Sequence, residues 1–524
     1  MQIVAAARKK GEAADLIGLD LSKMDFSGAE LGGANLSGAD LSQADLNGAN
    51  LEAAILIGAD LSEADLRRAK LNQSDLSGTD LFKADLFGAN LSKAKLIGAK
   101  LIRANVIEAD LGGANLSDAD FSWTDATQVN LHGAKLSRAN LIRANLTEAD
   151  LGRADLRMSN ISGSSLSEAN LEQANLNHAN LDGADLSQAR LGRANCRQVN
   201  LNQANISNAD LTQADLTGAK LNGANLVGAT LVQASLHGTD LNGASLSSAN
   251  FEQAELIQTD LSMATLNKAI LIGVDFSGAN LSGTDLYGVD LFDSNLNEVI
   301  FEGTDLSEAR IGGTWFGNVN LAQAKGLDTV EHSGPSYVDL RTIYRSRGKI
   351  PEKFLRGTGA ADAIIDYAAS LAEQDVRYAS CYIGFVAEDE EVADRLYGDF
   401  QQNGLRCWLL PEPLTSDDSR KVPSMGPKWA SEKLVIILSE GSMQSDWLQN
   451  QVSAALKQET KAQATILCPI WLDATIIDAE APWAAELGRN RTVYDFSQWQ
   501  TEEAYRQAFE PLLRELEATD GGAI

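Results

Sequence analysis

The residues that could do chemistry are concentrated in one stretch near the end of the sequence. Met443 to Glu459 reads MQSDWLQNQVSAALKQE, an amphipathic pattern that predicts a helix beginning at Ser445 or Asp446. Trp447 and Gln451 are four residues apart, so they would share one face of that helix. An indole and an amide on one face can bind and orient a ligand, but neither group carries charge or donates a proton readily.

Metal-ligating side chains are few and scattered. The four cysteines are Cys196, Cys381, Cys407 and Cys468. They form no CxxC pair, which indicates neither a zinc site nor a disulfide framework. His132, His178 and His237 lie far apart in the sequence and are expected on the surface. We therefore expect no metal, and cysteines that indicate no disulfide framework suit a reducing cytoplasm.

The segments that must position the helix alternate between strand and helix patterns from residue 376 to residue 517. The expected strands are SCYIGFVA, LRCWLL, KLVIILS and ATILCPIWL, and the flanking expected helices are DEEVADRLYGDFQQNG and TEEAYRQAFEPLLRELEA. This alternation predicts parallel strands covered by helices, an α/β domain of flavodoxin-like type. Sites in such sheets lie at the carboxyl ends of the strands, here 384–389, 410–414 and 439–447.

These segments resemble the TIR family from about Tyr378 to Glu517. The resemblance rests on DEEVADRLYGDFQQNGLRCWLLPEPL and LVIILSEGSMQSDWLQNQVSAAL. Many TIR domains cleave NAD+ between nicotinamide and ribose. The transition state resembles an oxocarbenium ion, which a carboxylate beside the ribose stabilises. The family carries this glutamate four residues after the tryptophan of a Ser-x-Trp-x-x-x-Glu pattern.

In this chain the position of that glutamate holds Gln451. Glutamine keeps the shape but not the charge, and losing one such contact lowers a rate by roughly 10²–10³. Glu459 lies about two turns further along the helix, ~12 Å away, so Glu440 is the expected stand-in. If NAD+ binds, the resemblance implies contacts with Phe385 and Trp447; otherwise no cofactor is expected.

Two further departures point away from an active enzyme. Bacterial TIR domains often have Ser-Tyr-Ser after the first strand, whereas this chain has Gly384, Phe385 and Val386. The loop that shapes the NAD+ pocket and the assembly contacts in the family would run through TSDDSRKVPSMGPKWASEK. Pro423 and Pro427 fall where a short helix should follow, and each costs about 3 kcal/mol inside a helix. The sequence therefore predicts a rebuilt loop.

The preceding part of the chain is a repeat. From Leu16 to Leu321, the positions ending in 1 or 6 are almost always Leu, Phe, Ile or Val, over 62 consecutive positions spaced five residues apart. The residue two positions earlier is small, mostly Ala. A period of five fits neither helix nor strand and predicts a chain that turns every five residues, with both positions inside. All nine prolines lie at or beyond Pro335, as continuous backbone bonding between stacked circuits requires.

This pattern resembles the pentapeptide-repeat family, whose members fold as right-handed quadrilateral β-helices with four pentapeptides in each coil. The resemblance covers about 310 residues. It implies about 15 coils and, at the usual spacing of strands, a rod roughly 75 Å long. Residues 1–15 are expected to form a helical cap over the first coil.

Charge limits the classes of partner. Lys and Arg total 43 against 72 Asp and Glu, a net charge of −29. Binding to nucleic acid or to anionic membranes is therefore not expected, and no apolar run approaches the roughly 18 residues of a membrane span. Some pentapeptide-repeat proteins mimic DNA and bind topoisomerases. Residues 1–325 carry 40 acidic and 24 basic residues, several times less charge per unit length than duplex DNA, so a DNA-mimic inhibitor is the third hypothesis.

A basic segment joins the two parts. Arg341 to Arg356 contains six basic residues and one acid, Glu352. This cluster could dock an anionic partner or clamp the acidic rod, and the clamp is the favoured interpretation. The apolar spacing from Ile364 to Leu371 predicts an amphipathic helix. The segment is therefore expected to be a structured connector.

The expected domains are a cap (1–15), a pentapeptide-repeat β-helix (16–325), a partly helical connector (326–375), a TIR-like domain (376–517) and a tail (518–524). This order is similar to architectures of cyanobacteria. The leading hypothesis is a non-catalytic cytoplasmic scaffold, in which the rod presents a degenerate TIR domain to a protein partner or to another copy of the chain. The alternative is a TIR-type NAD+ hydrolase that clustering activates.

Overall fold

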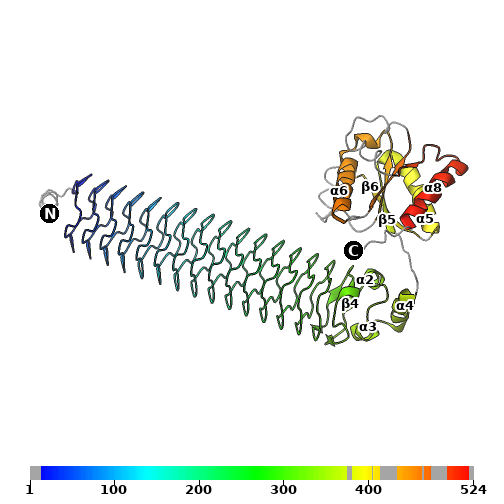
Figure 1. Ribbon diagram of the computed structural model, residues 1–524, viewed down its shortest axis with the longest axis horizontal. Coiled ribbons are helices and arrows are strands. Elements are labelled where there is room, and N and C mark those ends of the chain that lie inside the picture. Colours follow the sequence, from blue (N-terminus) through cyan, green and yellow to red (C-terminus); the bar gives the residue numbers. More distant parts are fainter. Residues whose placement is uncertain are drawn as a thin grey trace. The chain divides into compact units, whose positions relative to one another are not determined.

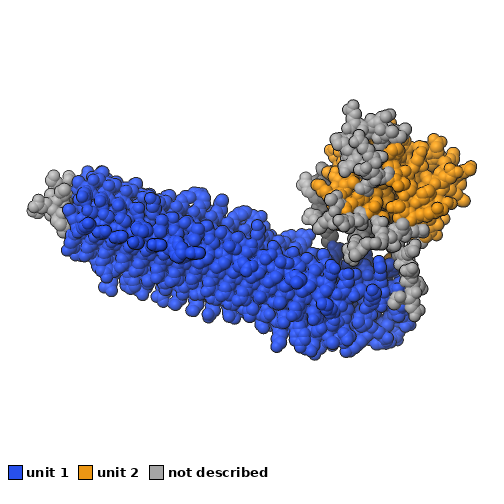
Figure 2. All heavy atoms as spheres, viewed as in Figure 1, with its two compact units in different colours: residues 1–374 blue, residues 375–524 orange. Residues whose placement is uncertain are grey.

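The computed structural model describes residues 13–373, 380–403, 405–412, 433–462, 465–473 and 492–517. The chain divides into two compact units, residues 1–374 and residues 375–524, which Figure 2 shows in different colours. Among the described helices, none combines the length and the apolar character needed to cross a membrane.

The repeat of unit 1 folds as stacked circuits, each made of four successive pentapeptides (Figure 1). Residues that precede the large apolar positions form parallel β-bridges with the equivalent residues one circuit later, from Asp15–Asn35 to Asp305–Lys325. One bridge in every pentapeptide gives each circuit four contacts with the next. The predicted turn every five residues and the stacking of circuits are confirmed.

The interior of unit 1 contains the two predicted positions of each repeat. Leu141 and, two residues before it, Ala139 are both buried, and Ala126 is buried at a position that usually holds leucine. Trp123 points outward and is half exposed, with the guanidinium of Arg143 over its ring at 4.8 Å. Residues of different size at the apolar position therefore all point into the interior.

The acidic and amide residues before each apolar position stabilise the corners. The side-chain oxygen of Asp20 accepts a hydrogen bond from Ser22 N (3.1 Å), and that of Asp40 accepts one from Ser42 N (2.9 Å). These Asx-type bonds hold the turn, in which the next residue, Lys23, has a left-handed φ of 58°. The hydroxyl and the N–H of Ser22 lower the pKa of Asp20 below its usual value. The negative charge of the repeat therefore has a local structural cause.

The stack continues beyond residue 325, the predicted end of the repeat. Strand β1 (Arg310–Ile311) pairs in parallel with β3 (Glu331–His332), and β2 (Trp315–Phe316) pairs with β4 (Tyr337–Val338). Arg310 lies opposite Glu331 and Trp315 opposite Tyr337, so the partners are further apart in the sequence than those of the regular circuits. The last circuit is therefore enlarged, and a 3-10 turn, η1 (Leu321–Gln323), lies within it.

Helix α2 (Leu340–Arg345) covers the edge of this last circuit. Thr342 Oγ1 donates to Phe316 O (3.0 Å), and Arg345 Nη1 donates to Asn318 O (2.8 Å). The end of a stack of strands otherwise exposes unpaired backbone groups. The polar side chains of α2 satisfy two of these groups, so the predicted connector acts in part as a cap of the rod.

Helices α3 (Glu352–Thr358) and α4 (Asp362–Glu373) follow, and α4 confirms the helix expected from the apolar spacing. Lys353 Nζ donates to the carbonyl of Asp328 (2.6 Å), and Arg356 pairs with the first residue of each of these two helices. Among the described residues, no base of the cluster pairs with a carboxylate of the rod. The basic cluster therefore contacts the rod through carbonyl oxygens and not through the carboxylates of the rod.

Unit 2 contains a parallel sheet of five strands in the order β6-β5-β7-β8-β9. The strands are β5 (Ser380–Phe385), β6 (Arg406–Pro411), β7 (Lys433–Leu438), β8 (Leu467–Trp471) and β9 (Tyr494–Asp495). The helices and 3-10 turns are η2 (Ala387–Asp389), α5 (Glu390–Gln402), η4 (Ser442–Gln444), α6 (Asp446–Ala462) and α8 (Glu502–Glu517). The parallel α/β organisation is confirmed, while β9 was not predicted.

Two apolar clusters cover the two faces of this sheet. Alternate residues of β7 point to opposite faces, as a strand requires: Val435 packs in the cluster that includes α5 and α8, and Ile436 in the cluster that includes α6. Because both faces are covered, the central strand β7 reads as a continuous apolar run from Leu434 to Leu438.

Several predictions concern residues outside the described ranges. These are most of the helical cap, residues 1–12, the rebuilt loop with Pro423 and Pro427, and the tail, residues 518–524. At the other end of the expected cap, Asp15 is already bridged to Asn35.

Candidate functional site

The carboxyl ends of four strands meet at one edge of the sheet. Glu412 N, after β6, donates to Phe385 O at the end of β5 (3.0 Å), and Leu472 N, after β8, donates to Leu438 O at the end of β7 (2.9 Å). The three segments that the sequence placed at the site therefore lie along the same edge.

Asp389 joins two of these strand ends. It is 5% exposed, and Ser439 Oγ donates to its Oδ2 (2.8 Å). Burial raises the pKa of Asp389 to about 6, although the bond from Ser439 acts in the opposite direction. A carboxyl group that titrates near neutral pH is a common property of acid–base catalysts. Here it also ties the turn after β5 to the end of β7.

A second carboxylate contacts the start of α6. Ser445 Oγ accepts a hydrogen bond from Leu448 N (3.0 Å), which makes Ser445 the N-cap, and donates to Glu412 Oε1 (2.8 Å). The predicted start of this helix is confirmed. A carboxylate beside a helix N-terminus is electrostatically stabilised. Sequence reasoning did not single out Glu412, although it lies in the predicted segment 410–414.

Gln451 lies on α6, one turn after Trp447, and its side chain is half-buried. Glu440, the expected stand-in, is exposed at the end of β7, and its backbone N donates to Asp473 Oδ2 (2.9 Å). Glu440 therefore lies at the correct edge of the sheet, on the residue pair that links the ends of β7 and β8.

Glu459 has a structural task at the opposite edge. Its Oε1 accepts hydrogen bonds from Ile466 N (2.7 Å) and Leu467 N (2.8 Å), where β8 begins. The carboxylate is buried and serves the backbone, so it does not reach the carboxyl ends of the strands. The expectation that Glu459 is too far away agrees with this placement.

Phe385 and Trp447 lie on opposite faces of the sheet. Phe385 is buried in the cluster with α5 and α8, whereas Trp447 packs against the cluster that includes α6. Val386, the next residue after β5, is buried on the α6 side. The end of β5 therefore contributes packing and not hydroxyl groups.

The edge is strongly acidic. The described segments 386–390, 410–412, 438–447 and 471–473 contain seven carboxylates and no Lys, Arg or His. These carboxylates are Glu388, Asp389, Glu390, Glu412, Glu440, Asp446 and Asp473. A pyrophosphate is usually held by cations or by free backbone N–H groups, and a surface of one sign repels ligands of the same sign. In the described part of the chain, no group of three side chains could hold a metal ion.

Two family models match the chain. The model for pentapeptide repeats (8 copies) matches most of residues 12–323, in the ranges 12–43, 44–81, 84–122, 127–163, 154–193, 179–218, 194–233, 209–247, 244–283 and 284–323. The model for the TIR domain matches residues 381–513. The first set of matches spans more than half of the chain. No curated protein matches it.

Solved structures similar to the chain are pentapeptide repeat proteins. HetL, involved in heterocyst differentiation regulation in the cyanobacterium Nostoc sp. strain PCC 7120, is 29% identical over 52% of this chain and 95% of its own, with a TM-score of 0.19. Rfr23 from the cyanobacterium Cyanothece 51142 is 35% identical over 19% of this chain and 60% of its own, with a TM-score of 0.14. QnrB1, a plasmid-mediated fluoroquinolone resistance protein, is 15% identical over 40% and 91%, with a TM-score of 0.20.

Proposed function

The chain belongs to the pentapeptide-repeat family and carries a TIR domain, and we propose that it is a non-catalytic interaction protein. In this proposal the repeat is a rigid support, and the TIR domain associates with a protein partner or with the TIR domain of another copy.

One observation carries the proposal: the edge where a TIR enzyme would bind NAD+ is acidic and lacks the carboxylate at the expected helix position. Gln451 is an amide on α6, and the described strand ends around it contain no base to neutralise a pyrophosphate. Such an edge favours a cationic protein surface as ligand.

The second candidate function is NAD+ hydrolysis, and Glu412 is the observation in its favour. This carboxylate is hydrogen-bonded to Ser445, the first residue of the Ser-x-Trp pattern. It could stabilise positive charge on a ribose from β6 instead of from α6. Glu412 and Glu440 are therefore the two residues whose removal distinguishes the candidates.

The test is an NAD+ turnover assay with the full chain at high concentration. We expect no release of nicotinamide above the uncatalysed background from the natural chain, nor from Glu412→Gln or Glu440→Gln. Release that either substitution lowers by roughly 10² or more would establish the hydrolase and reject the proposal. Gln451→Glu measures how far the single missing charge accounts for inactivity.

Association is tested separately by light scattering and by binding to candidate partners. Reversing the charge of two exposed edge residues, in Glu440→Lys with Asp446→Lys, should abolish association through the edge. The matched control is Asp394→Lys with Glu503→Lys, which changes the same net charge on exposed positions of α5 and α8. If both pairs act alike, the acidic edge is not the contact surface.

The proposal includes finer assignments. The repeat is taken as a right-handed quadrilateral β-helix and the TIR domain as flavodoxin-like, an assignment that the 2-1-3-4-5 order of its strands supports. A cytoplasmic location is supported by the four cysteines, which are buried and form no disulfide. A cyanobacterial origin is suggested by the similarity to HetL and Rfr23.

A further inference from the structure

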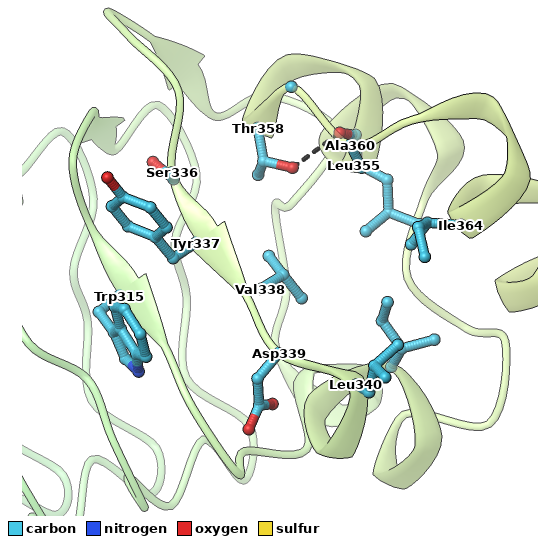
Figure 3. Close-up of a pocket in the computed structure, with 12 residues that line it drawn as sticks. Trp315, Ser336, Tyr337, Val338, Asp339, Leu340, Leu355, Thr358, Ala360 and Ile364 are labelled. Atoms are coloured by element: carbon cyan, nitrogen blue, oxygen red, sulfur yellow. Dashed lines mark hydrogen bonds between the residues drawn. The ribbon is translucent and has the colours of Figure 1, made fainter.

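A pocket of about 460 Å³ lies in unit 1 where the last circuit meets its helices (Figure 3). The side chains of Val338, Leu340, Leu355 and Ile364 converge on one space, and Ile343 of α2 also lines it. The volume is within the range, about 300–1,000 Å³, of pockets that bind small molecules or inserted side chains.

The rim of this pocket exposes large apolar side chains. Trp315 is 46% exposed, Tyr337 is 59% exposed and Leu340 is 61% exposed. The rings of Trp315 and Tyr337 lie side by side with centroids 5.2 Å apart. Adjacent apolar residues this exposed are typical of surfaces that bind another molecule.

Three bases of the connector cluster have no partner for their side chains among the described residues. Arg345, Lys353 and Arg356 bind carbonyls or acids of unit 1, as described above. The side chains of Arg341, Arg347 and Lys349 bind neither a carbonyl nor an acid of the described residues. Arg341 follows Leu340 at the start of α2, and the other two follow its end. These three bases therefore lie at the two ends of α2, the helix that lines the pocket. A helix of six residues is about 9 Å long, so both ends are close to the pocket.

The pocket lining contains one carboxylate, Asp339, and it is already engaged. Asp339 is the N-cap of α2 and accepts hydrogen bonds from Thr342 N (2.7 Å) and Asn318 N (3.2 Å). The pocket lining therefore presents no unengaged carboxylate, while the bases Arg341, Arg347 and Lys349 flank α2, on a protein whose net charge is −29.

We infer that this surface, the α2 pocket, docks an acidic amphipathic segment of a partner protein. An apolar side chain of the segment enters the pocket, and its carboxylates pair with Arg341, Arg347 and Lys349. Most of the remaining surface repels an acidic segment, so charge directs it to this place. The site is distinct from the acidic edge of the TIR domain, which has the opposite charge. In this inference three of the six bases of the basic cluster have the docking role.

The probe is a fluorescent helix-forming peptide with Leu and Trp at i, i+3, i+4 and i+7 and Glu at the flanking positions. Binding to the full chain is followed by fluorescence anisotropy. We expect saturable binding that weakens with salt, because exposed charges are screened. A peptide of the same pattern with Lys in place of Glu should bind at least tenfold more weakly.

Two sets of variants locate the site. Arg341→Glu, Arg347→Glu and Lys349→Glu together should weaken binding about tenfold, or ~1.4 kcal/mol, which is the sum expected for three exposed ion pairs. The matched control is Lys93→Glu, Arg103→Glu and Lys268→Glu, three bases of the rod that also lack an ion pair with a described residue. Leu340→Ser should also weaken binding about tenfold, whereas Ile57→Ser, at an exposed position of the rod, should not.

Three results would overturn the inference. One is equal weakening by the two charge triples, which would show general attraction. Another is equal binding of the Glu and Lys peptides. The third is a different occupant: a dimer in sedimentation that Leu340→Ser abolishes would identify a second copy, and decanoate binding without peptide binding would identify a small amphiphile. Hydrogen–deuterium exchange of each variant checks that α2 remains folded.

Discussion

The two units reach a stable interior by different routes. In the repeat of unit 1 the buried positions recur in every circuit, so Leu141 packs as its counterparts in other coils do. In unit 2 each buried residue has its own set of partners: Phe400 stacks on Phe509, more than a hundred residues later, with centroids 5.2 Å apart. A repeat can therefore gain or lose pentapeptides and keep the same buried positions. In the α/β domain each buried residue depends on particular partners elsewhere in the sequence.

Their carboxylates differ in the same way. Asp20, Asp25 and Asp305 repeat one arrangement, in which the hydroxyl and the N–H of the residue two positions later lower the pKa of the carboxyl group. Among the described aspartates, Asp389 in unit 2 differs, because burial raises its pKa to about 6. The first kind of carboxylate stabilises a local turn, and the second lies where strand ends from distant parts of the sequence meet.

Deletions should show the largest difference between the units. Removing residues 161–165 takes one five-residue step out of the repeat and keeps every later apolar residue inside. Removing Gly163 alone shifts the pattern by one and brings apolar residues to the corners, so we expect a loss of about 4 kcal/mol or more. Hydrogen–deuterium exchange of the neighbouring coils measures the effect region by region.

The matched deletion in unit 2 is residues 452–456 of α6. Five residues are about 1.4 turns of helix, so the remainder of α6 would turn its apolar face away from the sheet, and Val452 and Ala455 would be lost from the core. We expect unit 2 to unfold while unit 1 keeps its protection. If unit 2 tolerated this deletion as well as the repeat tolerates its own, the contrast between the units would be wrong.

Acidification should affect the two units with opposite sign. The Asp residues of the corners have a lowered pKa in the folded state, so their contribution is complete above about pH 4 and is lost as the pH falls further. Asp389 has a raised pKa, so its contribution is complete below about pH 4 and is lost as the pH rises through about 6. Urea unfolding of the full chain at pH 3, 5 and 7.5, followed by hydrogen exchange, separates the two effects.

Asp389→Asn isolates the contribution of unit 2. The amide keeps an acceptor for Ser439 Oγ and carries no charge, so we expect unit 2 to gain roughly 1–3 kcal/mol at pH 7.5 and much less at pH 5. The control is Asp495→Asn, because the N–H of Ser497 lowers the pKa of Asp495; this change should not stabilise. A gain from Asp389→Asn that is equal at both pH values would exclude titration as its cause.

Sequence predicted the parts of the fold that obey a period. The five-residue phase fixed which repeat residues are buried, and apolar runs located β5 to β8. The enlarged last circuit was not predicted, because the separation of Arg310 from its partner Glu331 is no longer a whole number of pentapeptides. Strand β9 escaped because Tyr494 and Asp495 alone form no apolar run, and only pairing with β8 makes them a strand.

The candidate site was predicted to the level of segments. The spacing of Ser445 from Leu448 is a local N-cap signature, so the start of α6 was found correctly. The partners of the carboxylates were not found, because the bond between Ser439 and Asp389 joins residues 50 positions apart and leaves no pattern in the sequence. Glu412 was not predicted for the same reason: its partner Ser445 is distant in the sequence, and only the folded sheet brings the two together.

The smallest expected effect tests the backbone of each unit with one substitution. Gly243 occupies a corner of the repeat with φ of 65°, and Gly398 lies inside α5; in both places a methyl group would have no atom within 4 Å. Gly243→Ala should therefore destabilise unit 1 by about 1 kcal/mol through backbone strain alone. Gly398→Ala should stabilise unit 2 by roughly 0.5–1 kcal/mol, because alanine favours a helix interior. Chemical unfolding of both variants measures the two signs, and equal signs would show that the corner does not require a left-handed residue.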